Sequence, residues 1–159
     1  MRKHQRLHGK LGVAFEIVRI RPDNPDFIYL VKVLNTTLAG LTGDTGESSY
    51  SSEMFDASTD CALVGYLDGK PVACGTFRYH SDGACEIKRM FSSVRGAGYA
   101  LLKSLEENAQ EMGYKEVVLS TRKVNQQAVN FYLRQGYKEI PPYGKYIGRD
   151  NSVCMGKLL

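Results

Sequence analysis

The feature that most constrains the fold is a strand, helix, strand pattern in the second half of the 159-residue chain. A strand-like run at 85–92 precedes a helical pattern at 98–112 and a second apolar run at 116–121. The second run contains Val117-Val118-Leu119 without alternation, which is typical of a strand covered on both faces. Such a unit forms a right-handed crossover between parallel strands. The pattern therefore predicts an α/β fold in which helices pack on a sheet.

The first half of the chain predicts antiparallel strands beside this unit. Strand-like runs at 61–67 and 70–79 are joined by Asp68-Gly69, which tolerates the positive φ angles of a type I′ turn. A further turn at 80–83 returns the chain into 85–92 and extends the hairpin to a meander. An earlier strand is expected near 15–20. We therefore expect a mixed, mostly antiparallel sheet.

Helix signals complete the expected order of elements. Asp23 or Asn24 can cap a helix that starts at Pro25. That helix carries one apolar stripe, formed by Phe27, Leu30, Val31, Leu34 and Leu38. Asn125 can cap the last helix, which ends near Gln135, and a closing strand follows at 152–158. The segment 39–60 is rich in Gly, Ser and Thr, with at most a short helix near 47–55.

Charge and hydropathy exclude some classes of protein. The net charge of +4 and the pI near 8.8 favour an anionic ligand, either nucleic acid or a phosphorylated cofactor. Basic residues are scattered and no aromatic-basic repeat is visible, so nucleic-acid binding is the weaker alternative. No apolar run reaches the roughly 20 residues of a membrane span, and no signal-peptide core follows the basic start. We expect a cytoplasmic protein that binds neither membrane nor nucleic acid.

The cysteines and histidines do not predict a metal site. Three of the four cysteines (Cys61, Cys74, Cys85 and Cys154) lie in apolar, strand-like runs, and none forms a C-x-x-C pair. We therefore expect free, buried thiols. His4 and His8 have the spacing of a metal pair but no third ligand, so no metal is expected.

A glycine-rich turn links the strand at 85–92 to the helix that follows. It reads Arg95-Gly96-Ala97-Gly98-Tyr99-Ala100. Glycines let a ligand approach the backbone closely, and the first amides of a helix have no internal partners. The first acids of the helix, Glu106 and Glu107, come two turns in, so the terminus stays open to an external anion. The turn suits a pyrophosphate, although a turn with packing value only is the alternative.

These residues resemble the GNAT N-acetyltransferase superfamily, whose hallmark is an R/Q-x-x-G-x-G/A turn between a strand and a helix. Arg95, Gly98 and Ala100 fit that turn. The resemblance spans roughly residues 60–159 and includes the run from Asn125 to Tyr132 with Gly136-Tyr137. A closing stretch from Ile140 to Tyr146 looks like one general bacterial subgroup of acetyltransferases. In that subgroup the segment between the residues that match Met90 and Arg95 is slightly longer.

The resemblance implies one domain over 1–159, with 1–12 as a basic tail. It implies a mixed, mostly antiparallel sheet of about seven strands flanked by about four helices. Acetyl-coenzyme A is the implied co-substrate, with no metal. The implied contacts to it come from the strand (Met90, Phe91 and Ser92), from the whole turn (Arg95, Gly96, Ala97, Gly98, Tyr99 and Ala100) and from Asn125 and Tyr132.

Spacing supports two of these implied contacts. Ile87 and Met90 are three residues apart, a change of parity that one extra residue in a strand produces. This predicts a bulge, which the family uses to pair backbone groups with the pantetheine arm. Asn125 and Tyr132 are seven residues apart and so share one helix face.

Two residues are implied to be catalytic. Tyr132 is the acid that protonates the leaving thiolate, with packing as the alternative and with Tyr137, Tyr143 and Tyr146 as rivals. Glu86 is the base that accepts the proton of the amine, directly or through a water. A glutamate exposed on the strand and paired with Lys88 or Arg78 is the alternative for Glu86.

We therefore expect an N-acetyltransferase that moves acetyl to a primary amine of a small molecule or peptide, by direct attack in a ternary complex. A non-catalytic acyl-coenzyme A sensor is the competing hypothesis, since it needs the turn but not Tyr132. The acceptor pocket is expected from residues 39–55 together with 143–146. The sequence leaves the acceptor open. It also leaves open the oligomeric state, for which a homodimer through the final strands is one arrangement.

Overall fold

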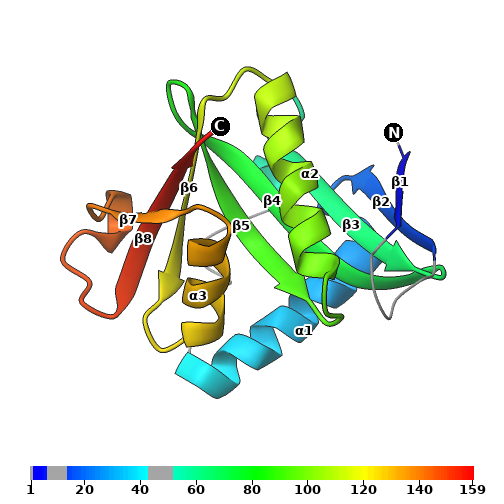
Figure 1. Ribbon diagram of the computed structural model, residues 1–159, viewed down its shortest axis with the longest axis horizontal. Helices are drawn as coiled ribbons and strands as arrows, with labels where there is room; N and C mark the ends of the chain where they lie inside the picture. The colour runs from blue at the N-terminus through cyan, green and yellow to red at the C-terminus, as the bar shows by residue number, and fades with distance from the viewer. Residues whose placement is uncertain (1, 7–13, 43–51) are drawn as a thin grey trace.

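The computed structural model describes residues 2–6, 14–42 and 52–159, and these form one eight-stranded sheet with helices on both faces (Figure 1). The strand order is β1-β2-β3-β4-β5-β6-β8-β7. Only β5 and β6 run parallel, and every other neighbouring pair is antiparallel. The strands are β1 (Arg2–Arg6), β2 (Ala14–Ile20), β3 (Cys61–Leu67), β4 (Lys70–Ser81), β5 (Ala84–Ser92), β6 (Glu116–Arg122), β7 (Lys138–Ile140) and β8 (Ser152–Leu158).

Three α-helices are present among the described residues, together with two short 3₁₀ turns. The helices are α1 (Pro25–Thr42), α2 (Ala97–Glu111) and α3 (Gln126–Arg134), and the 3₁₀ turns are η2 (Ser52–Met54) and η3 (Gly144–Tyr146). The α/β fold class, the mostly antiparallel sheet and the crossover through α2 are confirmed.

The described elements differ from the expectations in three respects. The described residues hold three α-helices rather than about four, and the described part of the segment expected to hold a short helix near 47–55 forms η2. α1 runs on to Thr42, although the loop was expected to begin at residue 39. The expected tail at 1–12 contains β1, which pairs along β2 through its backbone. A wholly polar strand has no hydrophobic period that a sequence could reveal. Residues 7–13 and 43–51 lie outside the described residues.

The core forms two layers on opposite faces of the sheet. Adjacent residues of a strand point to opposite faces, so Leu63 and Ala73 join α2 while Val64 and Cys74 join α1. α3 packs on the same face as α2, because Tyr132 belongs to the α2 layer. All four cysteines are free and buried, as expected. The helices therefore pack against both faces of the sheet around β4 and β5.

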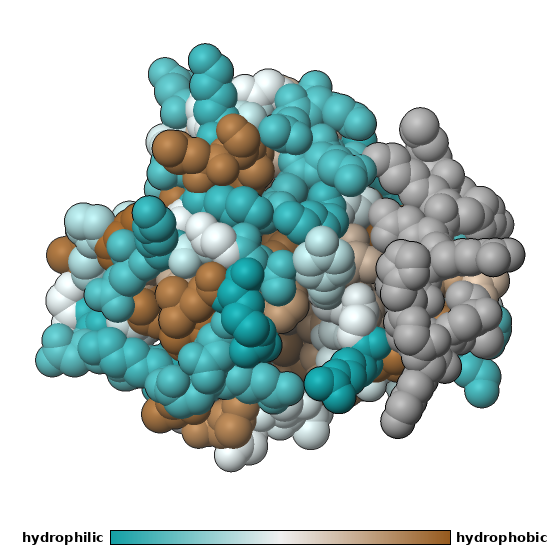
Figure 2. Space-filling model, viewed as in Figure 1, coloured by the Kyte–Doolittle hydropathy of each residue, from teal (hydrophilic) through white to brown (hydrophobic). Residues whose placement is uncertain are grey.

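None of the described helices is long and apolar enough to cross a bilayer. Figure 2 shows hydrophilic residues over most of one face, with hydrophobic residues in separate patches. The described residues also contain no group of three His, Cys, Asp or Glu side chains that could hold a metal ion.

Candidate active site

The candidate site begins where β5 and β6 separate. The two strands, both fully described, pair only at Ala84–Glu116, Cys85–Val117 and Glu86–Val118. β5 then continues to Ser92 beside β4, and β6 to Arg122 beside β8, but the two strands no longer pair with each other. Backbone groups of the separated segments lose their partner strand, and a ligand can take its place. The sheet therefore opens at this point.

A bulge in β5 marks the same place. Cys74 pairs with Phe91 and Thr76 with Lys88, so β5 carries one extra residue between these pairs. Arg89 sits there with a φ of 56°, a conformation that is uncommon for a residue with a side chain. The carbonyl oxygen of Lys88 accepts a hydrogen bond from Thr76 Oγ1 at 3.1 Å. The bulge predicted from the Ile87 and Met90 spacing is confirmed and is centred on Arg89.

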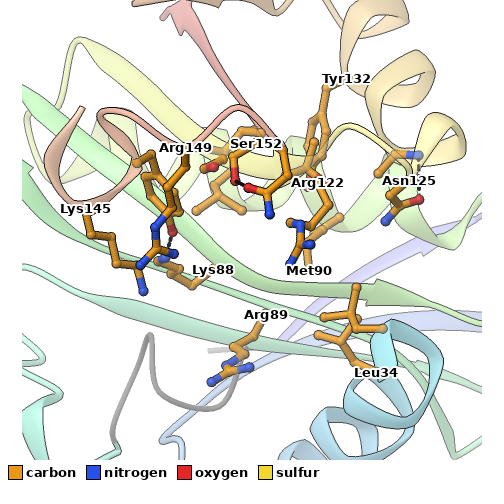
Figure 3. Close-up of a pocket in the computed structure, with 18 of the residues that line it drawn as sticks. Leu34, Lys88, Arg89, Met90, Arg122, Asn125, Tyr132, Lys145, Arg149 and Ser152 are labelled. Carbon is orange, nitrogen blue, oxygen red and sulfur yellow. Dashed lines mark hydrogen bonds between the residues drawn. The ribbon is translucent and has the colours of Figure 1, made fainter. Parts of the chain in front are cut away.

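A pocket of about 770 Å³ lies in this opening (Figure 3). α1 closes one side of it, α3 another, and the segment between β7 and β8 a third. Its lining residues are Leu34, Leu38, Ile87, Lys88, Arg89, Met90, Leu119, Ser120, Thr121, Arg122, Asn125, Ala128, Tyr132, Lys145, Tyr146, Arg149, Asp150, Asn151 and Ser152. Three of the predicted site residues, Met90, Asn125 and Tyr132, are therefore brought together.

The glycine-rich turn lies outside this pocket lining, at the start of α2. Gly96 precedes the helix with a φ of 89°, and the first turn of α2 holds no acidic residue. Among the described residues, none accepts a hydrogen bond from the amides of Arg95, Gly96, Gly98 or Tyr99. Four open amides at the positive end of a helix fit a pyrophosphate. The residues present therefore suit the phosphates of a coenzyme A ester.

A Cβ at position 98 would make only ordinary van der Waals contacts with the described residues, so packing alone does not require a glycine there. A Cβ there would lie 3.4 Å from the Ser92 Cβ and 3.9 Å from the Phe131 ring. Ser92 itself donates a hydrogen bond to the carbonyl oxygen of Val94 at 2.8 Å, which tightens the turn.

Tyr132 points from α3 into the pocket (Figure 3). Its side chain is only 6% exposed and packs edge-on against Phe131 and Tyr137. Among the described residues its hydroxyl has no hydrogen-bond partner. Burial raises the pKa of Tyr132 well above its usual range. The hydroxyl therefore keeps its proton and is available to a group in the pocket.

The rival tyrosines are engaged elsewhere. Tyr137 donates to Glu106 Oε2 at 2.8 Å inside the core, and Tyr143 donates to Glu86 Oε2 at 2.7 Å. Tyr146 lines the pocket, but its hydroxyl accepts a hydrogen bond from Lys88 Nζ at 2.7 Å. Burial raises the pKa of Tyr146 to about 12. Tyr137 and Tyr143 thus commit their protons to carboxylates, whereas Tyr132 and Tyr146 both keep a hydroxyl proton without a described acceptor.

Glu86 is buried at the closed end of the opening and does not line the pocket. Its Oε1 is 3.0 Å from Arg78 Nη2, and its Oε2 is 3.6 Å from Lys88 Nζ. The alternative interpretation of Glu86 is correct about the pairing with Arg78 and Lys88 but not about exposure, since Glu86 is only 2% exposed. Its role as a base stays a prediction.

The remaining predicted residues cap a helix, pack against the sheet or belong to the glycine-rich turn. Asn125 Oδ1 accepts a hydrogen bond from the Ala128 amide at 3.3 Å, which confirms it as the cap of α3. Met90 packs on the α2 side of the sheet and Phe91 on the α1 side. Within the described residues, none of 91–100 lines the pocket. The pocket and the turn are therefore two neighbouring parts of one site.

The sequence did not single out the cationic residues of the pocket. These are Lys88, Arg89, Arg122, Lys145 and Arg149. They come from three segments of the chain, so no local spacing connects them. The sequence did point to part of this group, because Lys145 and Tyr146 lie in the segment 143–146 that was expected to line the acceptor pocket. In the other expected segment, none of the described residues of 39–55 lines the pocket, and 43–51 lie outside the described residues.

Comparison with known sequences points to one family. The sequence model of the acetyltransferase (GNAT) family matches residues 30–137. An IAA acetyltransferase of Azospirillum brasilense is 32% identical over 102 residues, which cover 61% of this chain and 67% of that protein. The uncharacterized protein YxbD of Bacillus subtilis is 36% identical over 73 residues, 45% of either chain.

Solved structures share the fold over nearly the whole chain. A Klebsiella pneumoniae protein, provisionally described as an acyl-CoA N-acyltransferase, superposes with a TM-score of 0.77 at 25% identity, covering 91% of this chain and 97% of that one. A PaiA N-acetyltransferase of Thermoplasma acidophilum, in complex with coenzyme A, superposes with a TM-score of 0.69 at 17% identity, covering 91% and 99%. The GNAT domain of S. lividans PAT gives 0.76 at 13% identity, covering 99% and 97%.

Proposed function

Since this chain belongs to the acetyltransferase (GNAT) family and is an acyltransferase, we propose that it transfers acetyl from acetyl-coenzyme A to the nitrogen of a primary amine. One observation carries the proposal. β5 and β6 part after Glu86–Val118 beside a turn whose four amides have no described acceptor. A long ligand with a phosphate at one end and a narrow arm fits both features.

The donor half of the site is built from backbone. The amides of Arg95, Gly96, Gly98 and Tyr99 bind the pyrophosphate, and Arg95 adds a mobile positive charge. Backbone groups of Met90, Phe91 and Ser92 lie along the arm, and Asn125 holds it from α3. Acetyl-coenzyme A supplies the thioester that makes the acetyl group transferable. The coenzyme A complex of the PaiA relative supports this donor.

The chemical step needs one proton to leave the nitrogen and another to reach the sulfur. The amine forms the new C–N bond, the C–S bond breaks, and Tyr132 delivers its proton to the departing sulfur. The proton of the amine passes to water or to Glu86, and Tyr132 recovers its proton from solvent. A hydroxyl with a raised pKa and no described partner suits the donor role. No covalent intermediate with the protein is required.

A screen of primary amines for release of free coenzyme A tests this proposal. Purified protein is mixed with acetyl-coenzyme A and single amines, and the free thiol and the acetylated product are measured together. We expect release that depends on both protein and amine. Tight binding of acetyl-coenzyme A without release for any amine would instead identify the sensor module.

A further inference from the structure

The pocket is strongly cationic. Among the described residues that line it, five are cationic (Lys88, Arg89, Arg122, Lys145 and Arg149), and Asp150 is the one carboxylate. Glu86 lies next to Lys88, but its other oxygen already pairs with Arg78, so it does not balance the pocket. A cleft of one sign concentrates ligands of the opposite sign.

Two of the cations lie against Tyr146, and Arg149 lies near them. Lys88 Nζ donates to its hydroxyl at 2.7 Å and lies 5.3 Å from the ring centre. Lys145 Nζ lies 5.5 Å from the same ring centre. Figure 3 shows Lys145 and Arg149 reaching down from their segment toward Lys88 on β5. Within the described part of the chain, neither Lys145 nor Arg149 forms an ion pair.

Gathering these cations is unfavourable without a counter-charge. Burial lowers the pKa of Lys88 to about 8, and repulsion from Arg78, Lys145 and Arg89 adds to the effect although Glu86 opposes it. The pKa of Lys145 is also lowered, by burial and then by Arg149. A bound anion would relieve both effects by favouring the charged forms. The cluster thus resembles a prepared anion site more than a surface ion-pair network.

The phosphates of acetyl-coenzyme A have a separate proposed binding site, the turn at the start of α2. The open amides of the turn at 95–99 lie outside the pocket lining, and Arg95 is exposed beside them. Tyr132 lines the same pocket as the cations, and Figure 3 shows it between Asn125 on one side and Lys145 and Arg149 on the other. An acceptor amine that reaches Tyr132 would therefore place its far end among Lys88, Lys145 and Arg149.

We propose that the acceptor is an anionic amine, whose carboxylate or phosphate binds Lys88, Lys145 and Arg149 while its nitrogen faces the thioester. This inference rests on the proposed acetyl transfer and adds the chemical class of the acceptor. The acidic group is unchanged in the reaction and serves only to orient the nitrogen. Guanidinium and ammonium groups bind such oxygens through charge-assisted hydrogen bonds.

Matched pairs of amines test the proposal directly. The pairs are L-phenylalanine with 2-phenylethylamine, 4-aminobutanoate with butylamine, and O-phosphoethanolamine with ethanolamine. Coenzyme A release is measured for each member at a fixed concentration of acetyl-coenzyme A. We expect kcat/KM at least about tenfold higher for the anionic member of at least one pair. The phosphate and carboxylate pairs show which acidic group is accepted. The proposal would be overturned if, in every pair, coenzyme A were released equally fast or faster with the amine that lacks the acidic group.

Two exposed cations allow a test that leaves the fold intact. Lys145→Met and Arg149→Met should each raise KM for the preferred anionic amine about tenfold, with KM for acetyl-coenzyme A unchanged. Lys138→Met, on the exposed edge strand and outside the pocket, is the control and should change neither value. If the two variants raise KM for acetyl-coenzyme A instead, the cations bind the donor and the proposal is wrong.

A binding measurement separates the two ways of failing. Calorimetry gives the affinity for acetyl-coenzyme A without turnover. If the protein binds it and acetylates amines without preferring the anionic members, the proposed function stands and the acceptor class is overturned. If the protein does not bind it, the proposed function itself is overturned. Butanoate, compared with butanamide, should raise the melting temperature of the coenzyme A complex of the wild type but not of Arg149→Met.

Discussion

The two ends of the cleft are built in different ways. The proposed donor end is one continuous stretch, 95–100, that offers backbone amides at the start of α2. The proposed acceptor end is made of side chains, with Lys88 on β5 and with Lys145 and Arg149 on the segment before β8. Backbone binds what all members of such a family share, whereas side chains can differ from one protein to the next. The difference separates what is general in this enzyme from what is its own.

Tyr132 lies where the two ends meet, so its removal should have the largest effect. Tyr132→Phe deletes the proton donor while the ring keeps its packing against Phe131 and Tyr137. We expect the acetylation rate to fall by about 10²–10⁴-fold, with unchanged affinity for acetyl-coenzyme A. Steady-state kinetics and calorimetry measure the two quantities. Tyr29→Phe, on the exposed face of α1, is the matched control. A variant as fast as the wild type would remove Tyr132 from the mechanism.

Lys88 probes the acceptor end through pH. Its pKa is about 8 in the folded protein against a usual 10.5, so the folded state binds fewer protons than the unfolded state between these values. Lys88 therefore makes wild-type stability rise with pH across that window, by up to about 3 kcal/mol. Lys88→Met lacks this contribution. Its stability relative to the wild type should thus be highest below pH 8 and fall towards pH 10.5.

Urea unfolding of both proteins at several pH values measures this difference. A constant difference from pH 7 to 10.5 would mean that Lys88 titrates normally. The cationic cluster would then carry no electrostatic strain, and the contrast between the two ends would weaken.

A charge at position 99 probes the donor end, with opposite signs for stability and binding. Tyr99 is half exposed in the first turn of α2. Tyr99→Glu should stabilise the helix by about 0.3–1 kcal/mol, because an acid there suits the helix dipole. The same charge should repel the pyrophosphate and raise KM for acetyl-coenzyme A about tenfold. Tyr99→Gln is the neutral control. If KM for the amine rises instead, the two ends have been assigned the wrong way round.

The smallest effect is expected at Asn125, which has a structural role as a helix cap and a proposed role in binding the donor arm. Asn125→Ala should cost about 1 kcal/mol of stability through the lost helix cap. Asn125→Ser keeps a capping oxygen and should restore that stability. If Asn125 also holds the donor arm, the serine variant should still raise KM for acetyl-coenzyme A. A serine variant with normal kinetics would leave Asn125 as a cap alone.

The sequence predicted those parts of the protein that depend on neighbouring residues. The Asp68-Gly69 turn has both φ angles positive, and Gly96 has a φ of 89° before α2. The bulge showed itself through the spacing of Ile87 and Met90. The two turns and the bulge each depend on a few consecutive residues, where backbone preferences and side-chain alternation decide the structure.

Other parts could not be predicted because they depend on distant contacts. Lys88 meets Tyr146 across 58 positions of the sequence, and nothing near Lys88 indicates that partner. The pairing of Glu86 with Arg78 and Lys88 was one of the two interpretations of the sequence, but its burial and its contact with Tyr143, 57 positions away, were not predicted. β1 was missed since its pairing uses the backbone and leaves no hydrophobic pattern.

A crystal structure of the protein with coenzyme A tests the division of the cleft most directly. We predict that the pyrophosphate oxygens lie within about 3 Å of the Gly98 and Tyr99 amide nitrogens. We also expect the sulfur to face the Tyr132 hydroxyl and Lys88, Lys145 and Arg149 to be left open for an acceptor. A pyrophosphate bound among these three cations would contradict the proposed division of the cleft.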